Sequence, residues 1–214
     1  MFLLALITCS SQSRLAHLPG ATRVTELANG ELLVGTDTGQ LWIVTSFGER
    51  VLLASVPGEK VAELVSDPLG RYWARTEGGQ VYGGDAWSPE TTLVGVASVL
   101  VRGCEDTRLL NSGEVVPGVS ALSLAHDSCE ILVAGTVDGE VGGHNVSRAR
   151  IVRVQAMKDG VLWVDADTNA GCLGCALPMS SVGVVDALPL HLAPFVAGEI
   201  VWIDADGTLW ITRG

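Results

Sequence analysis

Four aspartates have the type and spacing that could bind a metal ion. Two of them lie two residues apart after one apolar segment, and the other two repeat this spacing after another segment; they are Asp165, Asp167, Asp204 and Asp206. Carboxylate oxygens are the ligands that Ca²⁺ prefers. Residues 165–176 nevertheless lack the glycine and the acidic last ligand of an EF-hand loop. The four aspartates are therefore weak metal candidates, and the alternative interpretation is that they are ordinary turn residues.

The cysteines form a second group with potential chemistry. Cys172 and Cys175 make a CxxC motif, which supports redox catalysis when it begins a helix, because the helix dipole lowers the thiol pKa. Here the motif lies among strands and turns, so a structural disulfide or a pair of buried thiols is the favoured interpretation. A zinc site is the remaining alternative, but it needs four convergent ligands, and the other Cys and His residues have no recognised zinc spacing.

No motif in the sequence specifies a reaction. The histidines and serines include no G-x-S-x-G nucleophile motif. We therefore predict no catalytic residue and no cofactor. Trp87 lies outside the register of the repeats described next, which makes it a candidate for an exposed binding contact.

The elements that would position these residues are repeated hairpins. Each copy is an apolar strand, a turn rich in Asp, Asn and Gly, and a second strand, a pattern that predicts a β-hairpin. The six copies span residues 30–42, 70–82, 104–116, 130–141, 160–171 and 198–210. Their turn glycines are expected to be Gly39, Gly79, Gly113, Gly139, Gly171 and Gly207. The first strands are apolar at successive positions, which indicates burial on both faces.

A second repeat suggests how the two ends of the chain meet. Residues 14–27 closely parallel residues 51–64, and the later copy follows the first hairpin as an outer strand would. The earlier copy has no hairpin before it, so we expect residues 15–18 to lie beside residues 209–212. The predicted fold is therefore all-β: a small closed β-propeller of five or six short blades, whose N-terminal strand completes the C-terminal blade. A β-sandwich or irregular barrel is the alternative.

This register also predicts an acidic rim. Asp37, Glu77 and Asp138 lie in other hairpins, at turns equivalent to those of the four aspartates. All these carboxylates should therefore lie on one face of a propeller. The alternative is again that Asp and Asn are simply favourable turn residues.

Composition restricts the class of partner. Apolar residues make up 48% of the 214 residues and charged residues only 17%, so much of the chain must be buried. The formal net charge of −11 opposes nucleic acid and anionic membrane surfaces, and it biases encounters toward cations and basic partners. We expect a monomer that binds a protein or a small ligand on a propeller face.

The N-terminus suggests export. Residues 1–9 form an apolar run too short to span a bilayer. Its end, Leu6-Ile7-Thr8-Cys9, resembles the lipobox of bacterial lipoproteins, which implies acylation of Cys9 after cleavage. We therefore predict a signal, lipobox and tether in residues 1–13 and a propeller in residues 14–214. The expected location is the periplasm or the cell surface, and the expected attachment to a membrane is through a lipid anchor only. An ordinary first segment is the alternative.

The hairpins also resemble known propeller repeats. Residues 39–43 and 206–212 resemble bacterial sensor-type repeats, and residues 79–85, 96–115 and 141–145 are similar to repeats of the regulator-of-chromosome-condensation superfamily and its secreted bacterial relatives. This resemblance implies a propeller and assigns no functional residue. Because one fold hosts many functions, we expect a non-catalytic binding or scaffold propeller. The alternatives are a propeller lyase or hydrolase with residues from separate blades, and a sensor fragment of a larger assembly.

Overall fold

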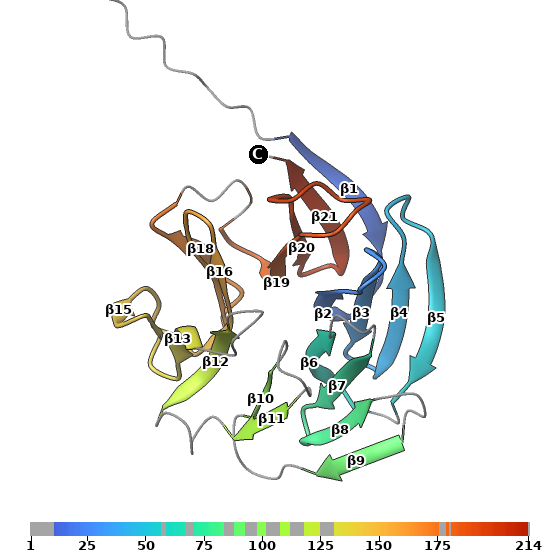
Figure 1. Ribbon diagram of the computed structural model, residues 1–214, viewed down its shortest axis with the longest axis horizontal. Coiled ribbons are helices and arrows are strands. Elements are labelled where there is room, and N and C mark those ends of the chain that lie inside the picture. Colours follow the sequence, from blue (N-terminus) through green and yellow to red (C-terminus); the bar gives the residue numbers. More distant parts are fainter. Residues whose placement is uncertain are drawn as a thin grey trace, which may run out of the picture.

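The computed structural model describes residues 11–56, 59–66, 71–83, 88–92, 98–101, 108–111, 118–124, 131–175, 179 and 181–213. Every regular element in these residues is a β-strand. Five sheets of three or four strands stand side by side around a common axis (Figure 1). This is the five-bladed arrangement of a β-propeller, and it agrees with the predicted all-β class and blade count.

The blades follow one another along the chain. Blade 1 contains β2 (Ala21–Glu26), β3 (Leu32–Thr36), β4 (Gln40–Val44) and β5 (Arg50–Ser55); blade 2 contains β6 (Val61–Ser66), β7 (Tyr72–Thr76), β8 (Gln80–Gly83) and β9 (Ser88–Thr92). Blade 3 contains β12 (Val119–Leu124), β13 (Ile131–Thr136), β14 (Glu140–Val141) and β15 (His144–Asn145). Blade 4 contains β16 (Ile151–Met157), β17 (Gly160–Asp165) and β18 (Ala170–Leu173). Blade 5 contains β19 (Val184–Pro189), β20 (Ile200–Asp204), β21 (Thr208–Arg213) and β1 (Ser11–His17). A two-stranded sheet, β10 (Ser98–Val101) and β11 (Arg108–Asn111), lies between blades 2 and 3.

Five of the six predicted hairpins are the second and third strands of the five blades. The sixth, at residues 104–116, lies mostly outside the described residues, with β11 as its described part. In four turns the expected glycine has a positive φ, from 78° at Gly207 to 86° at Gly79 and Gly139. The prediction for blade 4 was wrong in one detail. Gly171 lies within β18, and the turn instead contains Thr168 at φ 62°.

Gly171 has a different role, because it faces a tryptophan. It pairs across the ladder with Trp163, and a Cβ built on it would lie 2.3 Å from that indole ring. Blade 2 repeats the arrangement: Gly83 pairs with Trp73, and its Cβ would lie 2.0 Å from the ring. In both blades, the missing side chain lets an indole lie flat across the neighbouring strand.

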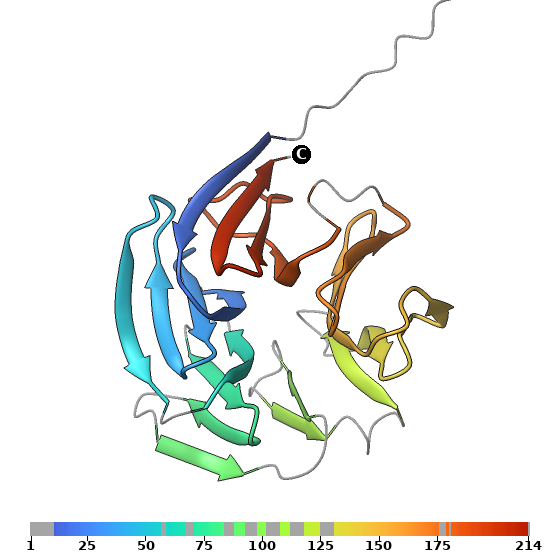
Figure 2. The same ribbon diagram turned by 180° about the vertical axis from the view of Figure 1, so that it is seen from behind.

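The first and last described strands belong to one sheet. Strand β1 pairs antiparallel with β21, with Ala16 opposite Leu209 and His17 opposite Thr208 (Figure 2). This is the pairing that the second repeat predicts. Likewise, β5 pairs with β4 as the predicted outer strand of blade 1.

The apolar core lies largely between blades. One cluster joins blade 5 to blade 1, with Val201, Ile203 and Leu209 packed among Val24 and Leu32. Five of the six tryptophans lie in described strands and pack into the core. Trp73 and Trp202 are buried, and Trp42, Trp163 and Trp210 are partly buried against clusters of the core. No helix long and apolar enough to cross a membrane occurs in the described part of the chain.

Candidate functional site

The inner strands of all five blades share one irregularity. Strands β2, β6, β12, β16 and β19 each shift register against their partner at the same place, between the first and third residues of the strand. The residue before the shift is always buried and apolar. The residue after it is charged in four blades: the five residues are Arg23, Glu63, Ala121, Arg153 and Asp186. A bulge re-aims the side chain that follows it, so these positions form a group around the propeller axis.

Asp186 is at the centre of this group, with a side chain that is 0% exposed. Its Oδ2 accepts a hydrogen bond from the backbone N–H of Val24 at 2.9 Å and another from Nη2 of Arg153 at 3.0 Å. Nε of Arg153 lies 3.0 Å from Oδ1. Arg153 also donates to the carbonyl of Val24. Residues of blades 4, 5 and 1 therefore meet at a single buried carboxylate.

Arg23 connects a further blade. Its Nε donates to the carbonyl of Ala62 in blade 2 at 2.6 Å, and its Nη1 donates to Thr22 at 2.6 Å and to Val185 in blade 5 at 3.4 Å. Burial lowers the pKa of Arg23, and the nearby Asp186 opposes that shift.

Glu63 and Arg75 complete the set. They form an ion pair within blade 2, with Nε of Arg75 2.5 Å from Oε2 of Glu63. Burial raises the pKa of Glu63, while Arg75 acts in the opposite direction. We call Arg23, Glu63, Arg75, Arg153 and Asp186 the axial cluster. It contains three arginines and two carboxylates, and it joins four of the five blades.

Two small hydroxyl residues connect neighbouring blades at the bulges themselves. Thr22 Oγ1 donates to the Val61 carbonyl at 2.8 Å, and Ser120 Oγ donates to the Ile151 carbonyl at 2.6 Å. Each bond runs from one inner strand to the equivalent point on the next blade. The sequence analysis missed this arrangement. The available signal was a charged or small residue two positions after the first apolar residue of each inner strand.

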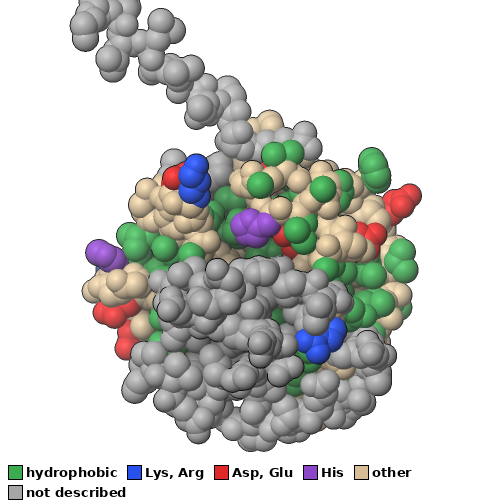
Figure 3. Space-filling model, viewed as in Figure 1, with side chains coloured by type: hydrophobic (Ala, Val, Ile, Leu, Met, Phe, Trp, Pro, Cys, Tyr) green, Lys and Arg blue, Asp and Glu red, His purple; other side chains and the backbone are tan. Residues whose placement is uncertain are grey.

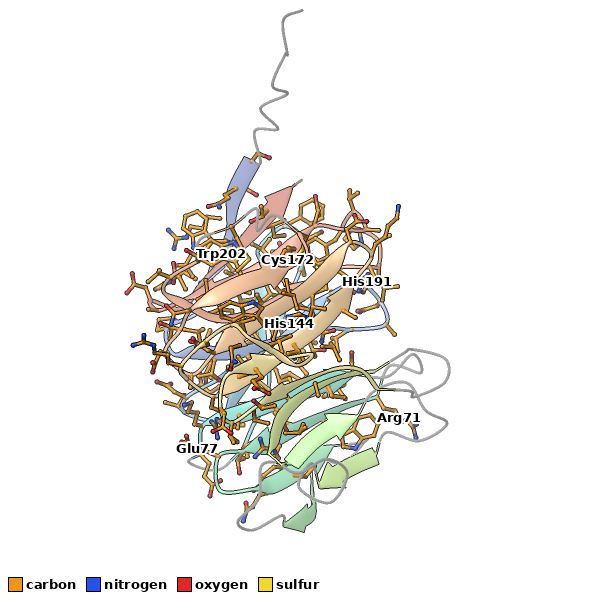
Figure 4. The ribbon with its side chains drawn as sticks, turned by 90° about the vertical axis from the view of Figure 1, so that its left-hand side faces the viewer. Arg71, Glu77, His144, Cys172, His191 and Trp202 are labelled. Carbon is orange, nitrogen blue, oxygen red and sulfur yellow. A yellow bond between two sulfur atoms is a disulfide. The ribbon has the colours of Figure 1, made fainter. Side chains whose placement is uncertain are left out.

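One face of the propeller carries an exposed carboxylate from every blade. The turns between second and third strands all lie at this face, which we call the turn face. Among the residues that the structure describes, the exposed carboxylates at this face are Asp37, Glu77, Asp138, Asp167 and Asp206. Figure 4 shows Glu77 on the side of the molecule opposite Arg71 and His191. Lys60 Nζ lies 3.6 Å from Glu77 Oε1, and in the described parts of the connections at this face the other exposed basic residues are Arg148 and Arg150.

Asp165 and Asp204, two of the metal candidates, hold their own turns together. Oδ1 of Asp165 accepts the backbone N–H groups of Asp167 and Asn169 at 2.9 and 2.8 Å, and Oδ2 accepts Ser147 Oγ at 2.5 Å. Burial acts to raise the pKa of Asp165, but the bonds from Ser147, Asn169 and Asp167 outweigh it and lower the pKa.

Asp204 repeats this role in blade 5. Its Oδ1 accepts the N–H groups of Asp206 and Thr208 at 3.0 and 2.9 Å, and Oδ2 accepts Trp210 Nε1 at 2.8 Å. The hydroxyls of Thr36, Thr76 and Thr136 accept the equivalent N–H in the other blades. Asp167 and Asp206 are exposed at the turn face. No group of three or more potential metal ligands occurs among the residues that the structure describes.

The remaining predicted sites are divided between described and undescribed residues. Cys172 and Cys175 form a disulfide, with Cα atoms 5.4 Å apart, at the end of edge strand β18. A Cβ at Gly160 would lie 2.8 Å from Cys175 Sγ, so the bridge packs against the backbone of β17. Cys9 and Trp87 lie outside the described residues, as do Cys104, Cys129 and His126.

Comparison with known proteins agrees with the architecture. A chain in the crystal structure of a mitotic checkpoint complex is 12% identical and has a TM-score of 0.52, over 91% of this chain and 74% of that chain. Saccharomyces cerevisiae Sqt1 matches with 10% identity and a TM-score of 0.36, over 89% of this chain and 58% of its own. The designed protein Ika8 matches with 14% identity and a TM-score of 0.33, over 92% and 61%.

At these identities the likeness concerns the fold alone, and the chain spans less than two thirds of Sqt1 and of Ika8. No protein family and no curated protein matches the sequence. The radial sheets and the match to the checkpoint-complex chain together define this protein as a β-propeller.

Proposed function

We propose that this protein is a non-catalytic binding propeller whose turn face takes a basic segment of a partner protein. The observation that carries the proposal is the presence of one exposed carboxylate in the equivalent turn of every blade. These five groups outnumber the three exposed basic residues described at this face, so the face keeps a negative potential that attracts cationic partners. The checkpoint-complex chain, which has the same fold, is part of a protein assembly, and this agrees with a binding role.

We further propose that the protein is bacterial, exported and anchored through Cys9, and that β1 closes the ring by completing blade 5. The lipobox-like segment supports export, and the Cys172–Cys175 disulfide agrees with an oxidising compartment. Incorporation of labelled palmitate in a bacterial host, absent in Cys9→Ser, tests the anchor. A protein that remains unlabelled and in the cytoplasm would contradict it.

Two variants with equal charge changes test the turn face. The turn-face variant combines Asp37→Asn, Asp138→Asn and Asp206→Asn. The control variant combines Glu31→Gln, Glu49→Gln and Asp159→Asn, which neutralises three carboxylates at the opposite ends of the strands. The probe is a fluorescent oligolysine peptide, and its anisotropy is followed at rising ionic strength.

We expect the turn-face variant to bind the peptide at least tenfold more weakly and the control variant to bind nearly as well as the original protein. Added salt should weaken binding, because exposed charges are screened. Equal losses in both variants would show that the peptide responds only to net charge and would contradict the proposal.

A further inference from the structure

The turn between β4 and β5 carries a phenylalanine that is 91% exposed, Phe47. The turn itself is well ordered by hydrogen bonds. Thr45 N donates to the Glu49 carbonyl at 3.0 Å, and Gly48 N donates to the Thr45 carbonyl at 2.9 Å. Thr45 Oγ1 also accepts the N–H groups of Phe47 and Glu49. The turn is therefore stabilised by backbone and Thr45 hydrogen bonds, and the phenylalanine side chain, which lies in solvent, contributes none of them.

Phe47 is part of a larger apolar surface, and Figure 3 shows hydrophobic side chains at the right-hand edge of the molecule, where Figure 1 places β5. Val51 and Leu52 on β5 are 59% and 49% exposed, and β5 is the edge strand of blade 1. Of the six large hydrophobic residues exposed in the described part of the chain, three lie between positions 47 and 52. A concentration of this kind marks an interaction surface, whereas single exposed apolar residues do not.

Strand β1 borders this surface directly. Arg50 Nη1 donates to the carbonyl of His17, and a Cβ built at Gly48 would lie 2.1 Å from the carbonyl oxygen of Leu15. The β4–β5 turn thus packs against β1, the strand that follows the N-terminal segment. Figure 2 shows β1 beside the strands of blade 1 at the edge of the ring. We call this surface the outer wall; it consists of β1, the β4–β5 turn and β5.

The charge of the outer wall differs in sign from that of the whole chain. Arg14 on β1 and Arg50 on β5 are exposed, and Glu49 is the one exposed carboxylate in these two strands and the turn between β4 and β5. The whole chain has a formal charge of −11. At this surface the local balance is therefore +1, so the repulsion expected from the whole chain does not apply to it; exposed apolar side chains bury in the headgroup region, and each nearby arginine adds attraction to anionic lipid.

The position of the candidate lipid anchor at Cys9 also favours a lipid bilayer as the partner of the outer wall. Ser11, the first residue of β1, is two residues after Cys9. An extended chain spans about 3.3–3.6 Å per residue, so an acylated Cys9 would hold the start of β1 within about 10 Å of the bilayer. The anchor would therefore bring the outer wall, and not the turn face, to the lipid surface.

We infer that the outer wall of blades 1 and 5 rests on an anionic bilayer, with Phe47 and Leu52 in the lipid interface and Arg14 and Arg50 at the headgroups. The inference rests on the export and anchoring part of the proposed function. It leaves the turn face open to a partner, since that face lies at the ends of the strands.

The test uses residues 9–214 with Cys9→Ser, a chain that lacks both the apolar run of residues 1–8 and the acyl group, which separates the wall from the anchor. Its sedimentation is measured with vesicles of phosphatidylethanolamine and phosphatidylglycerol and with vesicles of phosphatidylcholine alone. The wall variant adds Phe47→Ser and Leu52→Ser. The matched control adds Val182→Ser and Val196→Ser, which are 69% and 65% exposed elsewhere.

We expect the Cys9→Ser chain to bind the anionic vesicles, and the wall variant to bind them more than tenfold more weakly, because two apolar insertions are lost. The control pair should bind unchanged, and phosphatidylcholine should bind less. In the acylated chain, hydrogen exchange of residues 45–55 should slow on vesicles relative to detergent.

Three results would overturn the inference. One is equal binding by the wall and control variants. Another is a dimer in sedimentation equilibrium that the wall substitutions dissociate, because the wall would then be a contact between copies. The third is that the Cys9→Ser chain does not bind vesicles and residues 45–55 of the acylated chain show no slowed exchange, although Cys9 of the original protein incorporates palmitate. This result would reject the wall and leave the anchor in place. Vesicle binding through the wall without palmitate incorporation would support the wall and reject the anchor.

Discussion

Asp186 is the single side chain on which the axial cluster most depends. Its carboxylate is fully buried and is shared by Arg153 and the backbone of Val24. Buried ion pairs add little net stability compared with apolar residues, but removing one partner leaves the other charged and unpaired. The cluster therefore serves to fix how the blades meet.

This predicts a large effect for Asp186→Ala. The substitution leaves Arg153 without its counter-ion, and we expect a loss of about 3–5 kcal/mol in the free energy of unfolding. Urea denaturation followed by tryptophan fluorescence measures it. Asp186→Ala combined with Arg153→Met should recover much of the loss. A loss below about 1 kcal/mol for the single variant, typical of an exposed pair, would show that the cluster is not buried in solution.

Asp165 predicts a dependence on pH. Its pKa is lowered in the folded protein, so the folded state favours the ionised form. The resulting stability is fully present above the ordinary aspartate pKa of about 3.9 and is lost as the pH falls through the lowered value. Asp165→Ala should therefore be less stable at pH 7, and the two proteins should converge toward pH 2. Melting temperatures across that range measure the difference; a constant difference would contradict the assignment.

The same carboxylate predicts the outcome of the calcium test. Oxygens that already accept bonds from Ser147, Asp167 and Asn169 would have to release them to bind an ion. We expect millimolar Ca²⁺ to leave the melting temperature unchanged. An upward shift that is absent in Asp165→Ala would instead support the metal site.

Among structural elements, β1 has the clearest predicted effect. It pairs with β21 along its length and contributes Ala16 to the core between blades 5 and 1. Deleting residues 1–10 should leave the melting temperature nearly unchanged. Deleting residues 1–17 exposes the edge of β21, and we expect aggregation or a fall of more than about 8 °C, as for a loss of several kcal/mol in a domain of this size. Equal melting temperatures for both truncations would contradict closure by β1.

The Trp–Gly pairs give a second prediction for elements. Gly171→Ala places a methyl group 2.3 Å from the Trp163 ring, which must move. We expect a loss of about 1–3 kcal/mol, as for other overpacked sites, and a changed tryptophan emission. Adding Trp163→Leu should relieve part of the loss. If it does not, the glycine is required for a reason other than the indole.

For the whole molecule, the hairpins could be predicted because each one is local. Each hairpin is specified by about a dozen consecutive residues, as in residues 30–42 and 198–210. These residues contain an apolar strand, a turn residue at a fixed offset and a glycine with positive φ. The pairing of β1 with β21 could also be predicted, because its sequence repeats that of another outer strand.

The axial cluster could not be predicted in the same way. Arg23, Arg153 and Asp186 are separated by more than 30 residues, and only the bulges bring them together. Nothing in the local sequence around Arg23 or Glu63 distinguishes them from exposed charges in strands. The turn at residues 165–169 was also misassigned, because Thr168 adopts a conformation that glycine usually supplies.

The sharing of one sheet by β1 and β21 has a consequence for how the protein matures. A chain that leaves the ribosome or the export channel N-terminus first must hold β1 unpaired until residues 208–213 arrive. Blade 5 can thus assemble only after residues 208–213 have been synthesised, and a product that stops before them keeps an unpaired sheet edge at β20, where other chains can add.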